Sequence, residues 1–280
     1  MAPGQLGEFT YRDGVAVVQL FFFTVYLGCA FVLCSRHGWS RGSGWLVLIT
    51  FSLLRILAGA FQLATINSPS RTTYGGALIC QSIGLSPLTV LNIALLTRVN
   101  RFVIQGISTK IFSLISLASL TGLSLGIYGG TKAAESSNHI TSNSIVQAAV
   151  CIFLAIYVFA VCLWGYLLRQ WKYIPAEENK LMVCFAACAP FISVRLVYGL
   201  LADFSGMKEF NPFEGDVTIF LCMAVLMEII AVAFCVFTGL RLRVLPKGGG
   251  GGGNGAGGVS SDASSDSERA LHGARTPGKF

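Results

Sequence analysis

Charged residues are scarce in this sequence: they make up 12% of the chain, whereas hydrophobic residues make up 54%. A soluble globular domain carries about twice that share of charge, which excludes a water-soluble fold for most of the chain. The net charge of +7 would suit nucleic acid if it formed one patch. The basic residues instead gather in short segments between apolar runs, which indicates a lipid bilayer as the partner and no nucleic acid.

Histidine is also scarce, and none of the three histidines falls in an apolar run. Intramembrane zinc hydrolases need several His and Asp ligands within their spans. A retinal pigment needs a lysine in its last span, and rhodopsin-like receptors carry an Asp-Arg-Tyr triplet after the third; this chain has neither. We therefore expect a protein that is not an enzyme and that needs no cofactor.

All nine cysteines lie in or at the ends of apolar runs. We interpret them as small buried hydrophobic residues and not as a disulfide framework. Cys184 and Cys188 are one helical turn apart, but no histidine lies nearby to complete a zinc site. The sequence therefore predicts no metal site.

Seven apolar runs are long enough to cross a hydrocarbon core, which needs about 20 residues of helix. Short polar turns, several with Gly or Pro, separate them. The predicted fold class is all-α, an integral membrane bundle of seven transmembrane helices. The predicted spans are Gly14–Cys34, Gly44–Ala64, Gly76–Leu96, Ile111–Ile127, Ile145–Leu168, Leu181–Leu201 and Val217–Leu240.

Lys and Arg predict the orientation, because cytosolic segments carry more of them than outer segments do. With the N-terminus outside and the C-terminus cytosolic, every cytosolic segment holds at least two and every outer segment one. The cytosolic residues are Arg36, Arg41, Arg98, Arg101, Lys110, Arg169, Lys172, Lys180, Arg241, Arg243 and Lys247. The outer residues are Arg12, Arg71, Lys132 and Lys208.

Composition divides the chain into two parts. Residues 1–245 form the predicted seven-helix transmembrane domain, whose loops are too short to hold a soluble domain. Residues 246–280 are rich in Gly and Ser without apolar periodicity, so we predict a disordered cytosolic tail. Serines among its acidic residues are candidates for phosphorylation and for contact with a cytosolic partner, although a solvated tail without a role is the simpler interpretation.

Three ionisable residues fall inside the spans: Arg55, Arg195 and Glu228. Each is costly in a bilayer unless it faces the bundle interior and meets a partner. Arg55 and Glu228 lie near the midpoints of their spans, and Arg195 lies about 5 Å toward the outer side at 1.5 Å per residue. We therefore expect the three side chains to share one layer.

Polar neighbours indicate which helix faces point inward, because they recur at helical spacing. Pro87 and Pro190 each remove a backbone donor, which often kinks a helix. We expect the second, third, sixth and seventh spans to enclose a polar interior, and the first and fifth to face lipid. The polar neighbours that we include in a candidate site are Gln62, Asn92 and Tyr198.

Two arginines and one carboxylate leave one net positive charge in this layer. A small anion or a lipid headgroup is the ligand that such a layer would bind. Alternatively, the charges form a structural network that only fixes helix packing, and the sequence favours neither interpretation. The candidate ligand-binding residues are Arg55, Arg195, Glu228, Gln62, Asn92 and Tyr198.

The fourth span contains Gly122-Leu-Ser-Leu-Gly126, which matches the nucleophile elbow of serine hydrolases. That elbow needs a strand-to-helix turn and a histidine partner, and this segment lies within an apolar run. The same spacing of small residues, continued by Gly130, is typical of close helix packing in membranes. We therefore interpret the glycines as a packing surface.

Several segments are distinctive: they include Tyr11-Arg-Asp-Gly-Val15, Phe51-Ser-Leu-Leu-Arg-Ile56, Ser82-Ile-Gly-Leu-Ser-Pro87, Pro190-Phe-Ile-Ser-Val-Arg-Leu-Val-Tyr198 and Met227-Glu-Ile229. In this order they resemble a fungal family of multi-pass membrane proteins catalogued as domain of unknown function 7702. The similarity covers about the first 245 residues. It implies a fungal seven-helix membrane protein, and it implies no activity.

Our leading hypothesis is a receptor-like protein that binds a small anionic or lipidic ligand around the intramembrane charges, in the plasma membrane and not an internal one. A transporter or lipid translocator is the first alternative, in which the charges act as a relay and the prolines mark moving helices. A structural membrane scaffold is the second.

Overall fold

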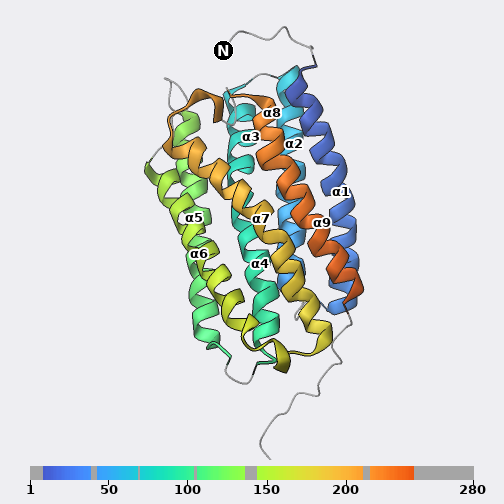
Figure 1. Ribbon diagram of the computed structural model, residues 1–280. Coiled ribbons are helices and arrows are strands. Elements are labelled where there is room, and N and C mark those ends of the chain that lie inside the picture. The colour runs from blue at the N-terminus through green and yellow to red at the C-terminus, as the bar shows by residue number, and fades with distance from the viewer. Residues whose placement is uncertain are drawn as a thin grey trace, which may run out of the picture. The chain divides into compact units, whose positions relative to one another are not determined.

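The computed structural model describes residues 9–38, 43–68, 70–103, 106–135, 144–210 and 215–242, all within the unit Met1–Val244. The predicted tail, 246–280, lies outside the described residues. Every regular element in the described ranges is a helix, and none is a strand (Figure 1). The predicted all-α class is therefore confirmed.

Within the described residues, seven helical segments are long and apolar enough to cross a membrane, as predicted. Most extend beyond the predicted apolar runs, because their polar ends continue past the hydrocarbon core. Five spans contain one continuous helix each: α1 (Tyr11–His37), α2 (Ser43–Asn67), α5 (Thr109–Glu135), α6 (Ser144–Leu168) and α7 (Ala176–Phe204). Two short 3₁₀ turns, η1 (Trp171–Tyr173) and η2 (Lys208–Phe210), flank α7.

The third span consists of two helices, α3 (Arg71–Ile83) and α4 (Leu85–Asn100), joined at Gly84. Pro87 lies in the first turn of α4 and has no N–H to donate to the carbonyl four residues earlier, which belongs to Ile83. The expected irregularity is thus present, but it lies one turn before the proline.

The seventh span is interrupted by a π-helical segment. Its parts are α8 (Val217–Phe220), the π-helix η3 (Leu221–Val225) and α9 (Leu226–Arg241). A π-helical turn inserts one extra residue and re-aims the side chains that follow it, and such turns recur at functional sites. The apolar run gave no sign of this interruption.

The span formed by α3 and α4 is the centre of the bundle. In each span we compare one apolar stretch of 18 residues, called its window, and 71% of the window of this span is buried. Residues of α4 pack against α2, α6 and α7, and α7 crosses α4 in Figure 1. The window of α6 is only 22% buried, which agrees with its predicted lipid-facing position. The windows of α1 and α2 are both 33% buried, and Asp13 and Gln19 of α1 are buried, so the first span is no more lipid-facing than the second, contrary to the prediction. On α5 the leucines 114, 117 and 120 are each more than 60% exposed, as suits a surface covered by lipid.

The α5 glycines form a packing surface in part, as interpreted from the sequence. A Cβ on Gly122 would lie 3.0 Å from Phe153 of α6, and one on Gly130 would lie 3.2 Å from Ile79 of α3. Close helix approach therefore depends on both positions. Gly126 differs, because a Cβ there would meet no atom within 4 Å.

Candidate functional site

The structure brings Arg55, Arg195 and Glu228 together from α2, α7 and α9. Their side chains are buried. Arg195 Nε donates to Glu228 Oε1 at 2.7 Å, and Arg55 Nη2 donates to the same oxygen. The expectation that these three side chains share one layer is therefore confirmed, and we call them the ion layer.

The π-helix helps to place the carboxylate of the ion layer. Glu228 lies in the first turn of α9, directly after η3 (Leu221–Val225). The extra residue of a π-helical turn rotates the following helix relative to the preceding one. Glu228 can therefore face α2 and α7 while Phe220, just before η3, faces the cavities described below.

Arg55 also binds the broken third span. Its Nη1 donates to the carbonyl of Gln81 at 3.2 Å, and its guanidinium lies 5.4 Å from the ring centre of Phe51. The guanidinium lies so close to Gly84 that a Cβ there would overlap it. The junction of α3 and α4 thus requires glycine in order to admit the arginine.

A small cavity lies beside Arg195. Its volume is about 60 Å³, enough for roughly four water molecules. The guanidinium carbon of Arg195 is 5.6 Å from the ring centre of Tyr198. The polar and glycine residues of its wall are Gln81, Gly122, Gly126, Arg195, Tyr198, Gly199 and Asp203.

A second cavity, of about 30 Å³, lies toward α1 and α2. Gln81 and Phe220 line both cavities, so their side chains form a shared wall. The amide nitrogen of Gln81 is buried and has no hydrogen-bond partner among the described residues. Its two N–H groups are therefore available to a small polar ligand or to water.

The other three predicted site residues lie in different surroundings. Tyr198 is buried in the wall of the cavity beside Arg195. Gln62 lines the second cavity and donates to Asp13 Oδ1 at 3.2 Å. Asn92 lines neither cavity and donates to the carbonyl of Leu88 in its own helix at 2.8 Å.

Sequence reasoning missed several polar residues of the interior. Asp13 was placed before the first span, yet its side chain is 2% exposed and accepts from the backbone N–H of Thr10 at 2.9 Å. The Thr10–Asp13 spacing is that of a capping box, so a helix-start search would have found it. Gln19 is also buried, and it donates to the carbonyl of Arg55 at 3.1 Å.

The family model described as "Domain of unknown function (DUF7702)" matches residues 9–245. The matched range contains the ion layer and both cavities. No curated protein shows a significant match to the chain. The chain therefore belongs to the family of the domain of unknown function DUF7702.

Proposed function

We propose that this multi-pass membrane protein is receptor-like and binds one small anion in the cavity beside Arg195. The observation that carries the proposal is that the Arg195 side chain has two contacts: it pairs with Glu228, and it also lines the cavity. The ion layer contains two cations and one anion, so its excess charge favours an anionic ligand. The assigned role is binding and not catalysis.

The donors of Arg195 support this assignment. Its Nε is used by Glu228, and no hydrogen bond engages its two Nη groups within the described part of the chain. A Cβ on Gly199, which lines the cavity, would lie 3.7 Å from Nη1. An arginine fork with free Nη groups binds a carboxylate or phosphate through paired charge-assisted hydrogen bonds.

The cavity volume narrows the class of ligand. About 60 Å³ holds an anion of a few heavy atoms, such as formate or acetate, and is small for a lipid headgroup. The unpartnered amide of Gln81 supplies a second donor. The ion layer carries one net positive charge, which a single monovalent anion would balance. We therefore favour a monovalent carboxylate.

Gly126 and Gly165 provide a matched pair of variants for the test. A Cβ at either position meets no atom within 4 Å, but only Gly126 lines the cavity. Wild type should gain roughly 5 °C in melting temperature at a concentration of acetate or formate 100 times its Kd. Gly126→Leu should abolish the gain by filling the cavity, whereas Gly165→Leu should retain it.

The outcome also separates the proposal from its alternatives. If no carboxylate, phosphate or lipid raises the melting temperature of wild type, the binding proposal is wrong. The ion layer would then be a packing network of a membrane scaffold. If only lipids raise it, the ligand is lipidic and the volume argument fails.

Transport is a second candidate, and the break at Gly84 favours it. Secondary transporters bind substrates near the membrane midplane beside interrupted helices, and Arg55 meets the interrupted third span at Gln81. Two cavities share the wall formed by Gln81 and Phe220. In proteoliposomes, Phe220→Ala should raise anion flux by removing part of that wall. Binding without flux under any imposed gradient would exclude transport.

We further propose that the N-terminus lies outside, the C-terminus lies in the cytosol, and the membrane is the plasma membrane. Arg98 at the end of α4 and Arg241 at the end of α9 support this, because basic residues favour the cytosolic side. In intact cells an N-terminal epitope tag should bind antibody without permeabilisation, and a C-terminal tag should not. The reverse pattern would invert the topology, and no surface signal from either tag would indicate an internal membrane.

A further inference from the structure

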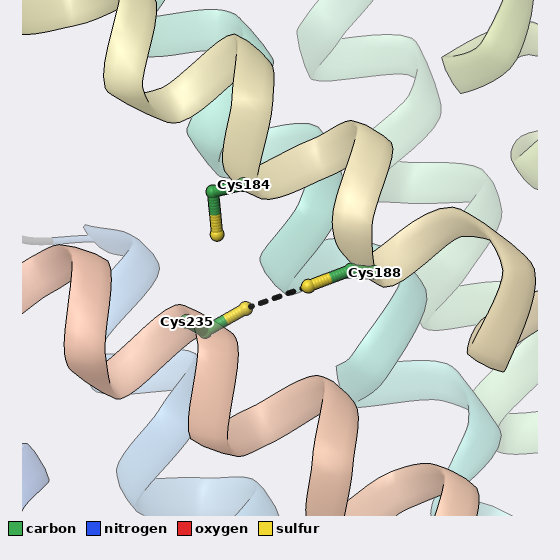
Figure 2. Close-up of side chains that lie close together, drawn as sticks. All are labelled: Cys184, Cys188 and Cys235. Carbon is green, nitrogen blue, oxygen red and sulfur yellow. Dashed lines mark hydrogen bonds between the residues drawn. The ribbon is translucent and has the colours of Figure 1, made fainter.

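Three buried thiols meet between α7 and α9, about two helical turns from the ion layer along each helix. Cys184 and Cys188 lie one turn apart on α7, and Cys235 faces them from α9 (Figure 2). Each side chain is at most 3% exposed. The three sulfur atoms lie within 4.8 Å of one another, and the sulfurs of Cys188 and Cys235 are 3.7 Å apart.

We propose that these thiols form a binding site for one copper(I) ion. For a metal at the centre of an equilateral triangle of sulfur atoms, the metal–sulfur distance equals the sulfur–sulfur distance divided by √3. A metal–sulfur bond of about 2.3 Å therefore needs sulfurs about 4.0 Å apart. The Cys188–Cys235 separation of 3.7 Å and the upper limit of 4.8 Å for all three pairs are compatible with that value.

The kind and number of ligands select copper(I). Thiolates are soft ligands that favour copper(I), zinc and iron–sulfur clusters over hard cations. Zinc takes four ligands in a structural site, and the cluster offers three cysteines without His, Asp or Glu among the described residues. A trigonal sulfur set suits a monovalent soft ion, which needs no fourth ligand.

The unmetallated thiols have weak partners that a metal can replace. Cys188 donates to the carbonyl of Ala231 at 3.4 Å, and Cys184 to that of Phe234 at 3.6 Å. Thiolates and not thiols bind metals, so copper(I) displaces thiol protons, which leave to the solvent. In the absence of copper the same contacts join α7 to α9 as ordinary packing.

The cysteine cluster lies at the same distance from the ion layer along α7 and along α9. Cys188 precedes Arg195 by seven residues on α7, and Cys235 follows Glu228 by seven on α9. Seven residues are two turns, or about 10 Å along a helix. Copper(I) with three thiolates carries a charge of −2, which the net +1 of the ion layer would partly offset across a medium of low dielectric constant.

The test is an anaerobic titration of the purified full chain with copper(I) in competition with bicinchoninate. We expect one copper per chain in wild type. X-ray absorption should give three sulfur ligands at about 2.3 Å. Cys184→Ala, Cys188→Ala and Cys235→Ala should each weaken binding at least 100-fold, whereas Cys222→Ala, at an exposed position, should retain wild-type affinity.

Melting temperatures measured without copper identify any alanine variant that fails to fold. For such a variant, the titration is repeated with serine in place of the same cysteine. The proposal is overturned if the three cluster variants retain copper as Cys222→Ala does, or if the absorption spectrum shows oxygen or nitrogen ligands in place of sulfur. It is also overturned if the thiols of reduced wild type take up no copper. None of these outcomes depends on whether the cavity beside Arg195 binds an anion.

Discussion

Glu228→Gln is expected to lower the free energy of unfolding by about 3–5 kcal/mol. The side chain is 1% exposed, and its Oε1 accepts from both Arg55 and Arg195. A neutral amide leaves two guanidinium groups buried without a counterion, and the small cavity beside Arg195 has room for only a few water molecules to solvate them. The penalty comes from the uncompensated cations and not from the hydrogen bonds alone.

The charge balance of the layer distinguishes this effect from a general loss of packing. Arg55→Met leaves a neutral pair of Arg195 and Glu228, so it should cost less than Glu228→Gln. Glu178→Gln is the control, because Glu178 also binds an arginine, Arg98, through contacts at 2.9 to 3.3 Å. Arg98 is 18% exposed near the end of α4, so its loss of a partner should cost about 1 kcal/mol.

Unfolding by sodium dodecyl sulfate in mixed micelles measures the three variants against wild type. The expected order of stability is wild type, Glu178→Gln, Arg55→Met and then Glu228→Gln. If Arg55→Met proves more damaging than Glu228→Gln, the carboxylate is not the group that balances the layer. The interpretation of the layer as two cations sharing one anion would then be wrong.

The ion layer could be predicted from sequence because its signals are local. A charge within an apolar run stands out, and its depth follows from the helical rise per residue. The similar depth of Arg55, Arg195 and Glu228 in the membrane could therefore be predicted without any information on contacts. The seven spans were equally accessible, since length and apolarity decide whether a helix can cross a bilayer.

The remaining features depend on contacts between helices, which a single sequence does not specify. Nothing in the sequence distinguishes Gly84 from other helical glycines. Its role follows only from the structure, in which the Arg55 side chain of α2 packs against it. Cys235 is separated from Cys188 by 47 residues, and only the register of α7 against α9 brings the two sulfurs together. For Asn92, the sequence predicted that the side chain faces the bundle interior. It did not predict that the side chain lies outside both cavities, because the positions of the cavities depend on contacts between helices.

Gly84→Ala is expected to lower the free energy of unfolding by about 3 kcal/mol, a large effect for one methyl group. The backbone at Gly84 is right-handed helical, with φ −58° and ψ −19°, so alanine is not excluded by conformation. The added Cβ would overlap the guanidinium of Arg55. That group must then leave Glu228 and the Gln81 carbonyl, or the junction of α3 and α4 must shift.

A double variant shows whether the overlap is the cause. Arg55→Met removes the guanidinium, so Gly84→Ala should cost little in that background, and the two single effects should be strongly non-additive. Gly126→Ala is the matched control, because its Cβ enters open space; a helical Gly→Ala change there should be neutral or stabilise by about 0.5–1 kcal/mol. If the costs of Gly84→Ala and Arg55→Met simply add, the glycine serves the helix junction itself and not the arginine beside it.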